Sequence, residues 1–284
     1  MCAIDMGSNS FRRIVGSFAD GRYVETGIES KTMGVGDDVD KHGRISDGKL
    51  AEIEETLRSF AAACRQDDAS APVAVGTAAF RNAPNGARAI EIASRAGVRM
   101  EIASEKRESE LAYLVGSLGQ SGQAVIDNGS RSIELVSMSG GAIQHQVFNL
   151  GYRIAYEEFF ARAVEPGAAI AAYRDRLLQE TAKAPFMRGQ SRLVGVEFME
   201  MAEVLFAPVP DGHVYPLRGL RDRLDAIASR PTEFAALKRT TNIDRALPRL
   251  VVAVTLMETF GYAELSLTSR QLGAGLIIEA NLRP

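Results

Sequence analysis

The chain has no long apolar run, few cysteines and no strong excess of charge of either sign. None of its apolar segments reaches the roughly 18 residues that a membrane span needs. The first residues lead directly into a predicted strand, which is not typical of a signal peptide. The formal net charge of −3 gives no general attraction to nucleic acid or to an anionic membrane. We therefore expect neither nucleic acid nor a membrane as a partner, and an anionic ligand has to be held by local groups.

Cysteine and histidine also provide no recognisable site. Cys2 and Cys64 are the only cysteines, they form no C-x-x-C pair, and the three histidines lack metal-ligand spacing. We interpret both cysteines as unpaired residues without a redox role, which predicts a reduced protein in the cytoplasm. The composition of 46% hydrophobic and 24% charged residues over 284 positions is typical of a globular protein with two domains.

The most informative feature is a short segment that occurs twice. Residues 3–11 read AIDMGSNSF and residues 125–133 read VIDNGSRSI, so both follow the pattern apolar-apolar-Asp-x-Gly-Ser-x-Ser-apolar. Each copy is a buried strand that breaks at Asp-x-Gly and then resumes, which predicts a hairpin turn. Glycine lets backbone N–H groups approach an anion closely, and the two hydroxyls add donors. One such turn in each half predicts two related domains that face each other across a cleft and hold a phosphate from both sides.

The order of the predicted elements gives the fold class. Strands are expected at 2–6, 11–18, 23–29, 72–77, 100–103, 123–127, 132–139, 142–150, 192–196 and 264–267. Helices are expected at 47–65, 85–96, 105–118, 152–163, 167–183, 197–206, 219–228, 243–260 and 275–281. This alternation indicates an α/β class, and the duplicated three-strand opening is the layout of the actin-like ATPase fold of sugar kinases and Hsp70. We expect a first domain over 1–118 plus about 271–284 and a second over 119–270, around a cleft.

Four motifs, taken in order, resemble the exopolyphosphatase / guanosine pentaphosphate phosphohydrolase (Ppx/GppA) family over nearly the whole chain. They are DMGSNS at Asp5–Ser10, GTAAFRNAPNG at Gly76–Gly86, ASEKRES at Ala103–Ser109 and DNGSRSIE at Asp127–Glu134. The resemblance implies a hydrolase that releases terminal phosphate from inorganic polyphosphate or from guanosine pentaphosphate, with Mg²⁺ or Mn²⁺ as cofactor. It also implies a role in ppGpp metabolism and a homodimer.

The same resemblance assigns roles to individual residues. Glu108 falls on the catalytic glutamate that activates water. Asp127 and Glu134 fall on acidic Mg²⁺-binding positions, and Asp5, the repeat partner of Asp127, adds a further carboxylate. The phosphate-binding residues are expected to be Gly7, Ser8, Asn9, Ser10, Arg81, Asn85, Gly129, Ser130, Arg131 and Ser132. Arg81 suits bidentate binding of phosphate, and Asn85 either fixes its loop or donates to the substrate.

Several departures from the family pattern concentrate in the second half. Gly129-Ser130-Arg131 stands where the family has three glycines, so side chains replace bare backbone in the second turn. Glu105 and Lys106 replace a glycine and an acidic residue before Glu108, and Arg107 replaces a second acid, which predicts a basic patch there. Gly195-Val196-Glu197 replaces a Gly-Thr-Gly-like segment, and Gln271–Ile277 lacks an expected arginine. These changes leave an alternative open: a catalytically weak or inactive member that binds polyphosphate or a phosphorylated nucleotide as a regulatory protein.

Overall fold

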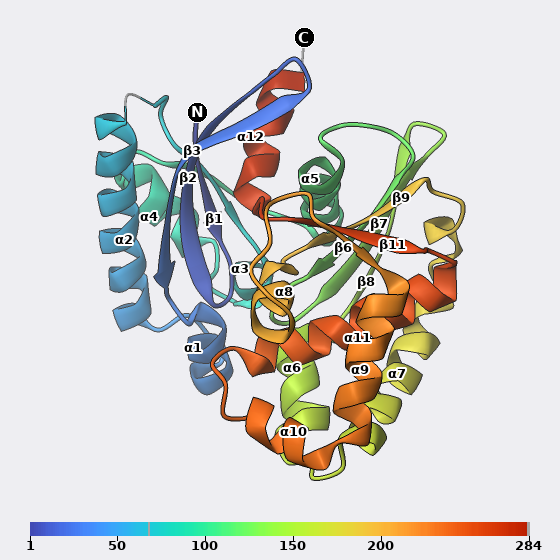
Figure 1. Ribbon diagram of the computed structural model, residues 1–284. Helices are drawn as coiled ribbons and strands as arrows, with labels where there is room; N and C mark the ends of the chain where they lie inside the picture. Colours follow the sequence, from blue (N-terminus) through green and yellow to red (C-terminus); the bar gives the residue numbers. More distant parts are fainter. Residues whose placement is uncertain (68, 283–284) are drawn as a thin grey trace. The chain divides into compact units, whose positions relative to one another are not determined.

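A computed structural model describes residues 1–67 and 69–282, and the chain separates into two compact units. Unit 1 consists of Met1–Gly119 together with Gln271–Pro284, and unit 2 is Gln120–Arg270. Each unit is a mixed β-sheet with helices packed on it, as Figure 1 shows. The α/β class predicted from the sequence is confirmed.

Unit 1 contains a five-stranded sheet in the order β3-β2-β1-β4-β5. Its strands are β1 (Cys2–Met6), β2 (Ser10–Ala19), β3 (Arg22–Thr32), β4 (Val73–Gly76) and β5 (Arg99–Ile102). Its helices are α1 (Val35–His42), α2 (Asp47–Gln66), α3 (Ala78–Asn82), α4 (Arg88–Arg95), α5 (Glu105–Ser117) and α12 (Leu272–Leu282). Consecutive residues of β1 point to opposite faces: Ile4 joins a core with α2 and α4, whereas Ala3 joins a core with α5 and α12.

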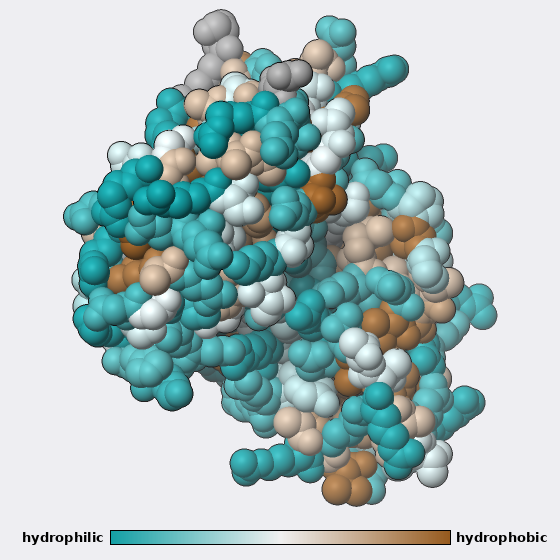
Figure 2. All heavy atoms as spheres, turned by 90° about the vertical axis from the view of Figure 1, so that its left-hand side faces the viewer, coloured by the Kyte–Doolittle hydropathy of each residue, from teal (hydrophilic) through white to brown (hydrophobic). Residues whose placement is uncertain are grey.

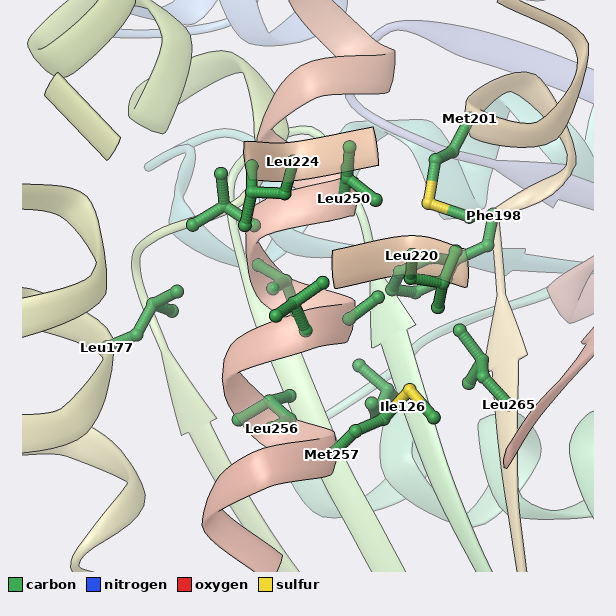
Figure 3. Close-up of a cluster of buried hydrophobic side chains, with 14 of the residues drawn as sticks. Ile126, Leu177, Phe198, Met201, Leu220, Leu224, Leu250, Leu256, Met257 and Leu265 are labelled. Carbon is green, nitrogen blue, oxygen red and sulfur yellow. The ribbon is translucent and has the colours of Figure 1, made fainter. Parts of the chain in front are cut away.

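Unit 2 contains a six-stranded sheet in the order β10-β11-β9-β6-β7-β8. Its strands are β6 (Gln123–Asn128), β7 (Ile133–Ser139), β8 (Ala142–Phe148), β9 (Arg192–Val196), β10 (Val214–Pro216) and β11 (Glu264–Thr268). Its helices are α6 (Tyr152–Ala155), η1 (Tyr156–Phe160), α7 (Pro166–Thr181), η2 (Pro185–Met187), α8 (Met199–Leu205), α9 (Leu217–Ser229), α10 (Pro231–Leu237) and α11 (Ile243–Phe260). The core lies between α11 and the sheet, where Ile126, Met257 and Leu265 meet (Figure 3).

The two sheets repeat one topology. The run β8-β7-β6-β9-β11 in unit 2 has the same pairing as β3-β2-β1-β4-β5 in unit 1: two antiparallel hairpins followed by parallel neighbours. This is the duplicated arrangement of the actin-like fold. The sequence missed the short elements α1, α3, α10 and β10, because none of them is long enough to show a clear hydrophobic period. It also placed a helix start at Asn85, whereas α4 begins at Arg88.

One expectation is wrong: the two cysteines are not unpaired. Cys2 on β1 and Cys64 on α2 form a disulfide, with their Cα atoms 5.9 Å apart. Both are fully buried and pack together with Val15 of β2. The pairing follows from the packing of α2 on the sheet, and a sequence separation of 62 residues gives no local signal of it. The argument for a reduced protein therefore fails on these two residues.

No helix within residues 1–67 and 69–282 is long and apolar enough to cross a membrane. The face shown in Figure 2 is mostly hydrophilic, with apolar residues scattered over it rather than gathered in one band. Both observations agree with the lack of long apolar runs in the sequence.

Candidate functional site

The first turn, the Arg81 motif and Glu108 come together at one edge of the unit 1 sheet. The parallel strands β1, β4 and β5 end side by side, since Met6 is in register with Gly76 and Gly76 with Ile102. The segment after each strand therefore begins at the same edge, where ligands of open α/β sheets bind. β1 leads into the first Asp-x-Gly-Ser turn, β4 into α3 with Arg81, and β5 into α5 with Glu108.

Backbone N–H groups near the start of α1 donate hydrogen bonds to carbonyls of the first turn. The Ser8 carbonyl accepts from Gly36 N–H at 2.8 Å, and the Asn9 carbonyl accepts from Met33 and Gly34 at 2.8 and 2.9 Å. In a trans peptide the next N–H points opposite to the carbonyl. The N–H groups of Asn9 and Ser10 are therefore directed away from α1, as an anion-binding turn requires.

The second turn has the same construction. The start of α6 donates to three of its carbonyls: Tyr152 N–H to Gly129, Arg153 N–H to Ser130 and Gly151 N–H to Arg131, each at 3.0 Å. By the same geometry, the N–H groups of the peptides that follow these carbonyls point away from α6. They belong to Ser130, Arg131 and Ser132. Three consecutive donors thus share one side of the turn.

The tight fit between this turn and α6 depends on a glycine outside the motif. A Cβ atom at Gly151 would lie 2.5 Å from backbone atoms of Arg131 and from the Gly129 carbonyl oxygen. No side chain fits in that space, so Gly151 lets the helix N-terminus reach the turn. By contrast, a Cβ atom at Gly129 would lie 3.6 Å from its nearest neighbour, the Ser132 carbonyl oxygen, which is an ordinary contact distance.

The loss of two glycines does not distort the second turn. None of residues 129–132 is among the positive-φ residues of the described chain. Ser130 and Arg131 therefore adopt backbone conformations that any L-residue takes without strain. Whether the side chains of Ser130 and Arg131 hinder the approach of a phosphate stays a prediction, as does the role of Arg131 toward a ligand.

The two turns differ in the charge of the residue that stands opposite their aspartate. In the antiparallel pair β1–β2, Asp5 stands directly opposite Arg12, whereas in β6–β7 Asp127 stands directly opposite Glu134. Opposed side chains have Cβ atoms about 5 Å apart on the same face of the sheet. All three carboxylates are buried, with 6% of Asp5, 8% of Asp127 and 2% of Glu134 exposed.

The Asp127–Glu134 pair fits a divalent cation. Two buried carboxylates in opposed positions repel each other unless a cation lies with them, and Mg²⁺ is commonly bound by one or two carboxylates plus waters and phosphate oxygens. No group of three or more His, Cys, Asp or Glu that could hold a metal occurs in the described residues. The expected metal role of Asp5 remains a prediction, and the cation at Arg12 opposes it.

Arg81 and Glu108 form a partly buried ion pair, with 21% and 12% of their side chains exposed. The Arg81 Nη1 donates at 2.9 Å both to Glu108 Oε2 and to the Ala103 carbonyl at the end of β5. Burial raises the pKa of Glu108, and the bond from Arg81 offsets this only in part. A carboxylate with a raised pKa, fixed at the sheet edge that bears the first turn, is suited to accept a proton from water.

The rest of the Arg81 motif builds the loop that carries this arginine. Gly86 lies so close to α3 that a Cβ atom would sit 1.9 Å from the Phe80 carbonyl oxygen. Asn85 uses both side-chain atoms on the backbone of Ile45, accepting from N–H at 3.0 Å and donating to the carbonyl at 2.8 Å. Of the two roles expected for Asn85, the structure shows the one that fixes the loop.

The predicted basic patch before Glu108 is neutralised. Arg107 donates from Nη1 and Nη2 to the two carboxylate oxygens of Glu279 on α12, both at 2.7 Å, and from Nε to Glu101 at 3.0 Å. Lys106 is largely exposed and lies 3.9 Å from Glu110. Arg107 thus joins two helices of unit 1 and supplies no unpaired charge for a polyanion.

Sequence reasoning missed two arginines near the turns. Arg12 lies opposite Asp5, and its position in the hairpin register could have shown this. Arg249 lies in an apolar helix that the sequence assigned to core packing only, yet it donates to the carbonyl of Asn128 just before the second turn. No pattern in the sequence distinguishes this buried arginine from a surface one.

Comparisons with known proteins agree with this arrangement. The sequence model described as "Ppx/GppA phosphatase family" matches residues 27–207. The fold is similar to that of the Ppx/GppA family member from Aquifex aeolicus, with a TM-score of 0.83, 20% identity and coverage of 99% of this chain and 97% of that chain. An exopolyphosphatase from Cytophaga hutchinsonii has a TM-score of 0.75, 18% identity and coverage of 98% and 97%. A search of curated proteins found no match.

Proposed function

The chain belongs to the Ppx/GppA phosphatase family, and we propose that it hydrolyses the terminal phosphoanhydride bond of inorganic polyphosphate or of guanosine pentaphosphate with Mg²⁺. The observation that carries the proposal is the Arg81–Glu108 ion pair at the sheet edge that also bears the first turn. It combines a phosphate-binding cation with a base of raised pKa.

Each group of unit 1 has a task in such a reaction. The N–H groups of Asn9 and Ser10, with the Ser8 and Ser10 hydroxyls, donate to phosphate oxygens. Arg81 offers the rest of its guanidinium fork to the phosphoryl group, because its described bonds both leave from Nη1. Glu108 accepts the proton of the attacking water and holds that water in line with the phosphorus.

In the proposed reaction, unit 2 helps to balance the negative charge of the phosphate groups. The N–H groups of Ser130, Arg131 and Ser132 hold phosphate oxygens, and Asp127 and Glu134 would hold the Mg²⁺ ion. A bound Mg²⁺ neutralises charge that develops on the phosphoryl oxygens. The proposal requires both turns to act on one substrate, as the predicted cleft would allow.

A regulatory binder is the second candidate. Arg81 is already committed to Glu108 and to the Ala103 carbonyl, and Arg131 places a long side chain within the second turn. A protein built this way could hold a polyanion without turning it over.

Phosphate release separates the two candidates. Wild-type protein is assayed with tripolyphosphate, long-chain polyphosphate, guanosine pentaphosphate and ATP, with Mg²⁺ or Mn²⁺. An enzyme loses about 10²–10⁴-fold in rate in Glu108→Gln, since the amide cannot accept a proton, while tripolyphosphate binding persists. Glu105→Gln, an exposed neighbour in the same turn of α5, is the matched control and should stay within about twofold. Binding without phosphate release from any substrate would favour the regulatory role.

The pH profile gives a second readout of Glu108. Its pKa is raised in the folded protein, and only the deprotonated form accepts a proton. The rate should therefore fall on the acid side at a pH above the roughly 4.3 of an ordinary glutamate. An acid limb at or below that value would remove Glu108 as the base.

A further inference from the structure

Arg249 is a buried charge in the mostly apolar helix α11. None of its surface is exposed, and the next residue on α11, Leu250, points into the hydrophobic core of unit 2 (Figure 3). Burying a guanidinium is costly unless it is paired and hydrogen-bonded. The groups that contact Arg249 therefore indicate its structural role.

Three of these partners, Glu197, Asn128 and Tyr152, lie next to the second turn. Arg249 Nη1 lies 2.9 Å from Glu200 on α8, and Nη2 lies 3.4 Å from Glu197, the residue that follows β9. Nη2 also donates to the Asn128 carbonyl at 3.2 Å, and the guanidinium carbon lies 4.4 Å from the ring centroid of Tyr152. One side chain thus connects the ends of β6 and β9 with the start of α6.

In the first turn, the corresponding carbonyl is held by a backbone hydrogen bond alone. There, the carbonyl of Met6, which precedes Gly7, accepts from the N–H of Thr77 after the neighbouring strand β4. The corresponding carbonyl in unit 2 is that of Asn128, and Arg249 donates to it from the side chain. By the strand registers Phe198 corresponds to Thr77, and Glu197 corresponds to Gly76. Glu197 has a φ of 68°, which is unusual for a residue with a side chain. Arg249 binds both the carbonyl and this carboxylate.

We propose that Arg249 is a positioning residue for the second phosphate-binding turn. It fixes the peptide between Asn128 and Gly129, while Tyr152, on which it stacks, fixes the next carbonyl through its own N–H. Together they turn the amides of residues 129–132 toward a phosphate. The proposal deepens the proposed function and rests on it for the identity of the ligand, but not for the geometry of the turn.

The experiment compares Arg249→Met and Arg249→Lys with Arg245→Met. Arg245 shares Glu200 at 2.7 Å but is partly exposed, so it controls for loss of that ion pair. Hydrogen exchange is measured without ligand, and the Michaelis constant for tripolyphosphate is measured separately from kcat. In both Arg249 variants the 128–132 segment should exchange about tenfold faster, while residues 5–10 stay as in wild type. The Michaelis constant should rise about tenfold with a smaller change in kcat, and Arg245→Met should change neither quantity.

A purely structural role gives a different result. It would lower the melting temperature and raise exchange throughout unit 2, without a specific change at 128–132, and that outcome overturns the proposal. Unchanged exchange and an unchanged Michaelis constant in a folded Arg249→Met protein overturn it as well. If both single variants fail to fold, Glu197→Gly and Glu200→Gln are added to Arg249→Met. This removes the carboxylates that have lost their partner, and hydrogen exchange of residues 128–132 is then compared with that of residues 5–10 as before. If no substrate is hydrolysed, the proposed function fails, whereas the exchange result still tests Arg249.

Discussion

The two Asp-x-Gly-Ser turns share one backbone design but differ in the charges around it. Each ends the first strand of its sheet, and each has its carbonyls held by amides at the start of a following helix. Around the first turn, Asp5 faces Arg12 and the core behind it is apolar. Around the second, Asp127 faces Glu134. A duplicated turn can thus specialise through its neighbours while its own backbone stays the same.

The positions before each glycine show the same contrast. Met6 is buried in an apolar cluster with Phe11 and Phe80. Asn128 is equally buried, and neither polar atom of its side chain has a hydrogen-bond partner in the described part of the chain. At the position before the glycine, unit 2 therefore buries an amide at a cost in stability, whereas unit 1 has an apolar side chain there. We interpret unit 1 as the half that holds phosphate and water and unit 2 as the half that holds phosphate and metal.

Among the changes that test the contrast between the two turns, the largest expected effect concerns the metal. Asp127→Asn should raise the Mg²⁺ or Mn²⁺ concentration for half-maximal activity about 10–100-fold, because an anionic ligand is lost. Asp5→Asn should leave that concentration unchanged, because Asp5 faces the cation Arg12. Equal effects of the two changes would contradict the division of roles.

A smaller effect is expected from the packing of the second turn on its helix. Gly151→Ala places a methyl group 2.5 Å from the backbone of Arg131, so unfolding free energy should fall by roughly 1–3 kcal/mol. Chemical denaturation measures this. Gly129→Ala is the matched control, because its methyl group would be 3.6 Å from the nearest atom, and it should cost less than Gly151→Ala. A tolerated Gly151→Ala would mean that α6 does not press on the turn.

The smallest expected effect on stability comes from Arg131. Its backbone conformation does not require glycine, so Arg131→Gly should change stability by no more than about 1 kcal/mol. Affinity for tripolyphosphate should fall by roughly 1–3 kcal/mol if the side chain grips the polyanion, and phosphate release should rise if it blocks the site. Titration calorimetry and phosphate release distinguish the two. No change in either would show that Arg131 points away from the ligand.

Much of this molecule could be predicted from the sequence, for identifiable reasons. The long elements were found because α2 and α11 have a clear hydrophobic period, and the two turns were found because Asp-x-Gly-Ser occurs twice. The Cys2–Cys64 disulfide, the Arg107–Glu279 pair and the Arg249 contacts were not found. Each of these joins residues far apart in the chain, so only the packing of helices on the sheets reveals them. The sequence left two roles open for Asn85 for the same reason. Its partner Ile45 is distant in sequence, so only the folded structure shows that Asn85 fixes its loop.

A crystal structure with Mn²⁺ and tripolyphosphate would test the central claim most directly. The division of roles predicts an anomalous manganese signal at Asp127 and Glu134, with phosphate oxygens on the N–H groups of residues 130–132 and of Asn9 and Ser10. A manganese ion bound by Asp5 instead, or a tripolyphosphate that contacts neither turn, would contradict the account.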